Sequence, residues 1–373
     1  MPFECAEFQV GGLGTMTLAS LLGLAISRRL GLRARVTAAA ETKAVGLGDV
    51  RGVVLGVART SLVVELAVAV VLALRFWAAY DVSPGRAAYL GVFHSVSAFN
   101  NAGFALWPDS LVRFATDPWI CLPIAASVIV GGIGFPVILE LRKRLRTPRA
   151  WSMHTKMTLW ATAVLLVLGT LVITANEWRN PATLGQLDTP GRLLAGFFQA
   201  VMPRTAGFNS IDVGAMHPSS LLITDILMFI GGGSAGTAGG IKVTTFALLA
   251  FVVIAEVRGE PSVHVVGRKL APAVQRQAIT VVLLGAGAVI VGTLAIMLMT
   301  ELRLEVVIFE VISAFATVGL STGITADLPA GAQVLLVVLM FIGRLGPITL
   351  ATALALRERT RRYEYPEERP IVG

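Results

Sequence analysis

Long apolar stretches alternate with short polar loops along the whole chain. A bilayer core about 30 Å thick needs roughly 20 apolar residues in a helix. The stretches that reach this length lie at about 8–27, 52–77, 118–141, 156–177, 220–257, 276–300 and 332–356. The pattern therefore predicts an all-α protein that crosses a membrane several times.

Three further apolar stretches are too short to cross a bilayer. They cover about 88–100, 192–204 and 305–316, and each lies between two predicted spans on the same side of the membrane. Since a helix of this length reaches only part of the way through the apolar core, these stretches predict re-entrant helices.

The short stretches also share a sequence pattern. FHSVSAFNNAGF (93–104), FFQAVMPRTAGF (197–208) and FEVISAFATVGL (309–320) each place a phenylalanine ten residues before a glycine. A second motif follows in the next span and reads VGGIG (130–134), IGGGS (230–234) and IGRLG (342–346). Such self-similarity indicates a repeated unit made of a span, a short helix, a glycine loop and a second span.

The repeat divides the chain into four units. A fourth copy of the second motif, VGGLG (10–14), has no glycine loop before it, so the first unit is expected to be truncated at its N-terminal side. The predicted units are 1–47, an incomplete first unit; 48–150; 151–270, with a broken second span; and 271–373, with a cytoplasmic tail.

Composition supports a membrane protein over a soluble one. Hydrophobic residues make up 55% of the chain, charged residues 14%, and the mean hydropathy is +0.76, whereas a soluble domain carries about 25% charged residues. Cys5 and Cys121 form neither a metal-binding spacing nor a disulfide framework. An ordinary soluble enzyme, a disordered chain and a disulfide scaffold are therefore excluded.

The net charge of +8 reflects topology rather than nucleic-acid binding. Most lysines and arginines lie in loops on one side, around 28–59, 142–156, 258–276 and 357–369. The opposite loops hold fewer, among them Arg75, Arg113 and Arg204. By the positive-inside rule the basic side is cytoplasmic, and so is the C-terminus.

The glycine loops suit a cation pathway. Irregular backbone within a membrane is tolerated only inside protein or around water. A glycine with φ > 0 lets adjacent carbonyls point the same way, and rings of carbonyls replace the hydration shell of potassium. The alternative is that the glycines only allow tight turns or close helix contacts.

Several motifs together resemble the Trk/Ktr/HKT potassium transporter superfamily, most closely its bacterial KtrB/TrkH-type membrane subunits. They are FHSVSAFNNAGFAL (93–106), PRTAGFNSID (203–212), FATVGLSTG (315–323), GGGSAGTAGGIKVTTF (231–246) and FIGRLGPITL (341–350). The resemblance implies M1–P-loop–M2 units arranged pseudo-fourfold around a pore. It also implies a homodimer in the bacterial plasma membrane, no cofactor in this chain, and a cytoplasmic RCK-type ring that binds the regulatory nucleotide.

The resemblance also implies a selectivity filter whose backbone carbonyls bind potassium. The filter residues are Asn101, Ala102, Gly103 and Phe104; Thr205, Ala206, Gly207 and Phe208; and Thr317, Val318, Gly319 and Leu320. All three signature positions in the sequence are glycine, which favours potassium. A serine that accompanies sodium selectivity in plant members would fall in the first loop, which this sequence lacks.

The glycine-rich tract at 231–240 predicts a helix break in the middle of a span. Glycine costs a helix about 1 kcal/mol relative to alanine, and six of these ten residues are glycine. A phosphate-binding loop is excluded because Ile241 separates Gly240 from Lys242. Close helix packing remains an alternative. The tract resembles the family's intramembrane gating loop, with Gly231, Gly232, Gly233, Gly236, Gly239, Gly240, Lys242 and Arg344 as gate residues.

Two cations fall within the predicted spans. Arg344 occupies the position of Gly132 and Gly232 in the other copies of the second motif. It would either raise a barrier to cations in a pore or bond to the exposed carbonyls of 231–240, and we expect both roles together. Lys242 follows the break and would either extend to the membrane surface or take part in gating.

Other readings of the pattern remain open. An alternating-access secondary cation transporter would use one or two broken helices rather than a repeated loop, and a non-conducting fragment would follow from the missing loop. Asp109, Asp212 and Asp327 follow the filter glycines closely and either concentrate cations or are solvated loop charges. A membrane enzyme is disfavoured because the spans contain no acid–base or metal-binding cluster.

Overall fold

The computed structural model describes residues 50–345, which comprise helices and one small hairpin. The helices are α3 Val50–Ala79, α4 Pro84–Phe99, α5 Pro118–Ile133, α6 Phe135–Arg144, α7 Met153–Glu177, α8 Thr189–Val201, α9 Pro218–Phe229, α10 Val243–Val257, α11 Pro272–Met299, α12 Leu304–Phe315 and α13 Ala330–Leu345. The predicted span at 8–27, the VGGLG motif and the polar tail lie outside the described residues.

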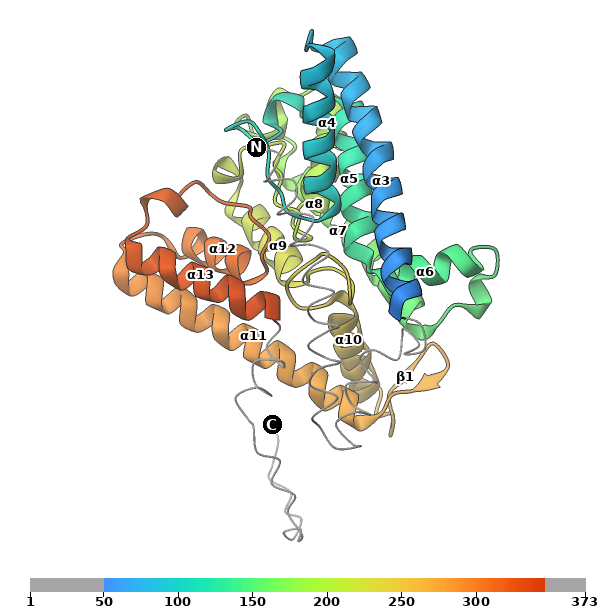
Figure 1. The fold of residues 1–373 in the computed structure, drawn as a ribbon. Coiled ribbons are helices and arrows are strands. Elements are labelled where there is room, and N and C mark those ends of the chain that lie inside the picture. Colours follow the sequence, from blue (N-terminus) through green and yellow to red (C-terminus); the bar gives the residue numbers. More distant parts are fainter. Residues whose placement is uncertain (1–49, 346–373) are drawn as a thin grey trace.

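Three repeated units account for this architecture. The second predicted unit contains α3–α6, the third α7–α10 and the fourth α11–α13, and each has a long helix, a short helix and then one or two further helices. Figure 1 shows the second and fourth units on opposite sides, with α9 and α10 between them. The predicted short helices are confirmed as α4, α8 and α12.

The long helices match the apolar stretches of the sequence. Gly56–Ala79, Met153–Glu177 and Pro272–Met299 are each long and apolar enough to cross a membrane. Their outward side chains remain apolar, and Leu62, Trp160 and Leu283 are all more than half exposed. Since a soluble helix would carry polar residues on such a face, these surfaces suit lipid.

The predicted span at 118–141 is not one straight helix, because the chain bends by 98° between α5 and α6. Gly134 has φ +99°, a conformation that favours glycine. Pro136 lies in the first turn of α6, where its missing N–H costs nothing and its fixed φ suits the start of a helix. The sequence G-F-P is thus the local signal for this break.

Within each unit, small residues let the helices approach closely. α3 packs along α4, and a Cβ added at Gly91 would lie 2.5 Å from the Ala69 carbonyl oxygen and 2.8 Å from the Ala73 nitrogen. In a membrane, apolar side chains gain little by leaving lipid, so such close backbone packing drives helix association. Across units, α5 packs on α8 and α9 packs on α12.

Short elements complete the connections between the helices. The 3-10 turns are η1 Val112–Phe114, η2 Pro148–Ala150, η3 Leu184–Gln186, η4 Val213–Ala215 and η5 Thr325–Asp327. The sequence analysis missed an antiparallel hairpin of β1 His264–Val265 and β2 Arg268–Lys269. Its turn residues Val266 and Gly267 both have φ > 0, as a two-residue hairpin turn of type I′ requires.

Candidate ion-conduction site

The loops that follow α4, α8 and α12 share one unusual backbone conformation. In each loop the first predicted filter residue and the glycine two positions later both have positive φ. The φ values are +50° and +73° for Asn101 and Gly103, +68° and +73° for Thr205 and Gly207, and +53° and +92° for Thr317 and Gly319. Positive φ is uncommon for residues other than glycine, so a threefold recurrence indicates a built feature.

These three loops lie side by side. A Cβ added at Gly103 would overlap the Ala206 carbonyl oxygen, and one added at Gly207 would overlap the Val318 carbonyl oxygen. The contacts place the loop of the third unit between those of the second and fourth. They also show that a side chain at Gly103 or Gly207 has neither the space nor the backbone conformation it needs.

Each loop is fixed to the helix that precedes it. The N–H of Ala102 donates to the Ser97 carbonyl at 2.8 Å, and the N–H of Val318 donates to the Ser313 carbonyl at 2.8 Å. In the third unit the N–H of Ala206 donates to the Met202 carbonyl at 3.0 Å. The second filter residue of each loop thus directs its N–H back toward the short helix.

The fourth predicted filter residues differ in environment. Phe208 and Leu320 are buried, with exposed fractions of 0% and 2%, whereas Phe104 is 55% exposed. The repeat therefore fixes the backbone of the three loops alike but not the surroundings of the side chain that follows each glycine.

The predicted break at 231–240, here called the broken segment, is present. α9 ends at Phe229 and α10 begins at Val243. The two ends of the segment pair, since Gly231 N–H donates to the Ile241 carbonyl at 2.8 Å and Ile241 N–H donates to the Phe229 carbonyl at 3.3 Å. The segment is therefore a loop between α9 and α10 whose two ends are hydrogen-bonded to each other.

The tip of the broken segment touches the first residue of all three glycine loops. The Thr237 hydroxyl donates to Asn101 Oδ1 at 3.0 Å, and Gly239 N–H donates to Thr205 Oγ1 at 3.3 Å. A Cβ added at Gly239 would overlap Thr317 Oγ1. The segment thus lies directly against the start of each glycine loop, where the loop leaves its short helix.

Backbone bonds also fasten the broken segment to the bend in the second unit. Gly233 N–H donates to the Gly132 carbonyl at 2.7 Å, and Thr237 N–H donates to the Gly131 carbonyl at 3.3 Å. In return, Phe135 N–H donates to the Ala235 carbonyl at 3.1 Å. The bend at Gly134 is therefore built against the segment.

Both intramembrane cations bind carbonyls of the broken segment. Arg344 Nη1 donates to the Thr237 carbonyl at 2.8 Å, which confirms the bond expected from the sequence. Lys242 Nζ donates to the adjacent Ala238 carbonyl at 2.7 Å. Lys242 therefore folds back on the segment, and the expectation that it extends to the membrane surface is wrong.

The assignment of Arg204 to an outer polar loop is wrong. Arg204 is only 6% exposed, and its Nη2 lies 3.3 Å from Thr162 Oγ1 and 3.5 Å from the Gly231 carbonyl oxygen. Its own carbonyl accepts from Asn101 Nδ2 at 3.1 Å. The sequence signal was its position directly before Thr205, within a re-entrant loop rather than beyond it.

One acidic residue considered as a cation concentrator has a different partner. Asp109 forms an ion pair with Arg113, with Nη2 2.7 Å from Oδ1, and the hydrogen bonds from this guanidinium lower the pKa of Asp109. The Asp212 carboxylate accepts from Gly214 N–H at 3.0 Å, and Asp327 is exposed. The charge of Asp109 is therefore largely offset by its own loop.

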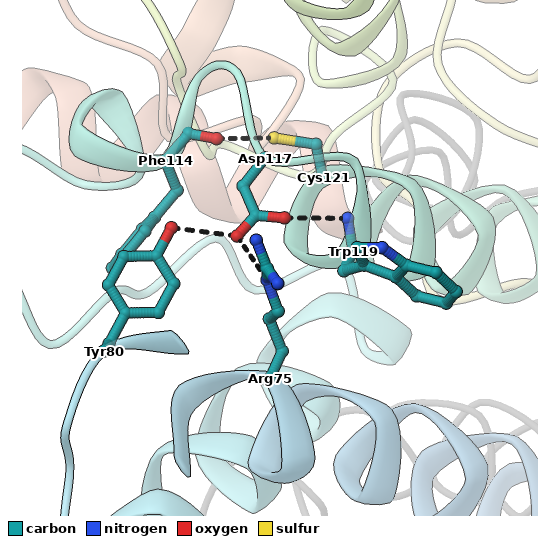
Figure 2. Close-up of polar contacts among 6 residues, drawn as sticks. All are labelled: Arg75, Tyr80, Phe114, Asp117, Trp119 and Cys121. Carbon is teal, nitrogen blue, oxygen red and sulfur yellow. Dashed lines mark hydrogen bonds and ion pairs between the residues drawn. The ribbon is translucent and has the colours of Figure 1, made fainter. Parts of the chain in front are cut away.

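The sequence analysis missed a buried carboxylate, Asp117, in the connection between α4 and α5. Figure 2 shows Asp117 accepting from Arg75 Nε and Tyr80 Oη, each at 2.8 Å, and from the backbone N–H of Trp119 at 3.0 Å. Asp117 is the N-cap of α5. It thus joins the last turn of α3 to the first turn of α5.

Apolar long helices and repeated short-helix loops define a multi-pass α-helical membrane protein. The sequence model of one family, described as "TrkH: Cation transport protein", matches residues 3–363. The chain therefore belongs to the TrkH cation transport protein family, whose members are transporters and not enzymes.

Relatives within this family can be aligned with nearly the whole chain. "Ktr system potassium uptake protein B" of Bacillus subtilis (strain 168) is 39% identical over 365 residues, which cover 98% of this chain and 81% of that protein. "Potassium/sodium uptake protein NtpJ" of Enterococcus hirae is 32% identical over 374 residues and is covered to 81%. The solved potassium transporter TrkH from Vibrio parahaemolyticus has a TM-score of 0.68 at 20% identity, covering 94% of this chain and 70% of its own, and supports the fold.

Proposed function

We propose that this chain is the pore-forming subunit of a potassium uptake system in the bacterial plasma membrane. The observation that carries the proposal is the recurrence of one backbone conformation in three loops that lie side by side. Carbonyls held in this way replace the hydration shell of potassium. The name of the Bacillus subtilis relative, which is 39% identical over 365 residues, supports potassium as the substrate, and the Enterococcus hirae relative is named for potassium and sodium uptake.

The ion would bind the backbone carbonyls of the glycine loops at 101–104, 205–208 and 317–320. Side chains at the first position of each loop serve a different purpose in this arrangement, since Asn101 and Thr205 hydrogen-bond the broken segment. Carbonyl coordination explains why asparagine or threonine, and alanine or valine, are equally acceptable in the loops.

The broken segment acts as the gate in this proposal. It contacts all three glycine loops from one side, and Arg344 holds the Thr237 carbonyl. Lys242 holds the neighbouring carbonyl, so two positive charges stand next to the pathway. Like charge raises the energy of a passing cation, so in this proposal the broken segment and its two cations close the pathway.

Assembly follows the same proposal. The chain forms a homodimer, its C-terminus is cytoplasmic, and a cytoplasmic RCK-type ring that binds the regulatory nucleotide controls the gate. The described basic loops support this orientation, because the α6–α7 connection and the hairpin after α10 lie at the same end of the molecule (Figure 1). The chain itself carries no cofactor, and its basic residues serve topology.

Replacing Gly207 with alanine tests the filter. The added Cβ disfavours φ +73° and overlaps the Val318 carbonyl oxygen. Protein expressed from its complete gene in potassium-uptake-deficient cells should take up potassium and rubidium, and Gly207→Ala should lose most of the preference over sodium. Gly85→Ala is the matched control, because no atom lies within 4 Å of the added Cβ.

Two results would contradict the proposal. One is the absence of potassium uptake although the protein is inserted in the membrane at normal levels. The other is unchanged potassium-to-sodium discrimination in Gly207→Ala, which would remove this glycine from the ion-binding loops.

A further inference from the structure

A buried carboxylate lies behind the glycine loop of the fourth unit. Glu310 of α12 is only 4% exposed. Its Oε1 accepts from Thr322 N–H at 2.9 Å and from the Ser321 hydroxyl at 2.6 Å, and its Oε2 accepts from the Thr325 hydroxyl at 2.8 Å. Both oxygens therefore hold the chain that leaves the loop.

A histidine occupies the same place in the second unit. His94 of α4 is fully buried, and its Nδ1 lies 2.8 Å from the Leu90 carbonyl oxygen. Because a carbonyl can only accept, Nδ1 carries the proton and Nε2 is left as an acceptor. Nε2 receives the N–H of Leu106 at 3.5 Å, and the ring stacks on Trp107 with centroids 4.7 Å apart.

A serine accompanies each of these acceptors. The Ser97 hydroxyl donates to the Phe104 carbonyl at 2.9 Å, and the Ser313 hydroxyl donates to the Leu320 carbonyl at 2.6 Å. These carbonyls belong to the residue directly after each loop glycine. One lone pair on each oxygen thus accepts a hydrogen bond from the short helix.

The register of the two sets is identical. His94 and Glu310 precede their loop glycines by nine residues, Ser97 and Ser313 precede them by six, and the bonded N–H follows by three. We call each acceptor-plus-serine pair a loop bracket. Chance would not align four side chains and four backbone groups in this way.

The third unit has no such bracket at the matching positions. These hold Phe198 and Val201, both fully buried and apolar. The loop after Gly207 is instead held by the second unit, since Asn209 N–H donates to the Ser110 hydroxyl at 3.3 Å. The two brackets therefore belong to the units that flank the third.

We infer that the loop brackets Ser97–His94 and Ser313–Glu310 are positioning residues that set ion discrimination at the outer end of the glycine loops. The inference rests on the proposed function. A bracket fixes both the carbonyl and a later N–H, so the peptide after the glycine is held in one orientation. A carbonyl free to rotate approaches a smaller ion closely, and discrimination against sodium then falls.

Removing single serine hydroxyls is the sharpest test. In the protein expressed from its complete gene, Ser97→Ala and Ser313→Ala should each lower the potassium-to-sodium uptake ratio about two- to tenfold, the range expected for one hydrogen bond. The double variant should lower it further. Ser127→Ala is the matched control, because this buried hydroxyl of α5 has no hydrogen-bond partner among the described residues.

Paired variants of the acceptors separate positioning from general damage. Glu310→Gln and His94→Gln each keep an oxygen that accepts the backbone N–H, and both should retain most of the ratio. Glu310→Leu and His94→Leu should lose it. If the leucine variants fail to accumulate, the serine variants, which lose one oxygen atom each, still decide the question.

The outcomes distinguish the inference from the proposed function. Normal uptake with an unchanged ratio in the double serine variant would overturn the inference alone, as would equal losses in Glu310→Gln and Glu310→Leu. Absence of potassium uptake by the unsubstituted protein would contradict the proposed function itself. If the leucine variants lower the potassium-to-sodium ratio and the glutamine variants retain it, the brackets are positioning residues.

Discussion

The bond between Arg344 and the broken segment gives the most direct prediction. Arg344→Ala removes a charge-assisted donor that lies 2.8 Å from the Thr237 carbonyl oxygen. Hydrogen bonds to charged groups contribute about 1.5–3 kcal/mol. Because this hydrogen bond is only partly buried, we expect its loss to cost about 1–2 kcal/mol, which is roughly a five- to thirtyfold change in an equilibrium.

If this bond holds the broken segment in a closed position, its loss should raise the ratio of open to closed protein by about the same five- to thirtyfold factor. Rubidium flux into proteoliposomes should therefore rise about five- to thirtyfold in Arg344→Ala at equal protein density, and the proposed cytoplasmic ring should change this flux less than in the unsubstituted protein. Arg344→Lys keeps the charge and a donor and should change little. Arg303→Ala is the control, because Arg303 pairs with Glu305 outside the spans. Unchanged or abolished flux in Arg344→Ala, with normal assembly, would refute the latch.

Two further predictions concern packing and pH. A Cβ at Gly343 would overlap the Phe315 carbonyl oxygen, so Gly343→Ala should sharply reduce the yield of folded protein in detergent. Gly287→Ala should not, because no atom lies within 4 Å of the added Cβ. Equal yields of the two variants would contradict this prediction. Burial and the bond to Asp117 raise the pKa of Tyr80 from 10 to about 12. The stability from this phenol should therefore be complete below pH 10 and lost as pH rises through about 12, and Tyr80→Phe should abolish that dependence in thermal unfolding.

Repetition made much of the fold predictable from the sequence. A phenylalanine ten residues before each glycine located α4, α8 and α12, because one packing solution recurs in each unit. The density of glycine at 231–240 located the helix break for a local reason, since the helix loses stability there whatever surrounds it. Both signals lie within a single stretch of chain.

Features that depend on contacts between units were harder to predict. The bend at Gly134 is stabilised by the Ala235 carbonyl, which comes from the next unit, although G-F-P was a local warning. Arg204 was assigned to an outer loop because its charge was counted without its position in the re-entrant turn. The bond from Arg344 to the broken segment was anticipated, but which carbonyl it reaches required the structure.

The loop brackets show a third case. His94 and Glu310 stand at equal distances from their glycines, so the register was available in the sequence. Their chemical types differ, however, and only the shared backbone N–H partner reveals that they do the same work. Side chains of different classes can therefore be equivalent when the group they serve belongs to the backbone.

The backbone bonds between the broken segment and the second unit have a consequence for how the proposed gate would move. Gly233, Ala235 and Thr237 all form backbone hydrogen bonds with residues 131–135. Away from water, each unpaired backbone group costs several kcal/mol. A partial displacement would leave several such groups unpaired at once, so intermediate positions are sparsely populated. Single-channel recordings of the protein should accordingly show abrupt transitions between closed and open levels, with no graded conductances between them.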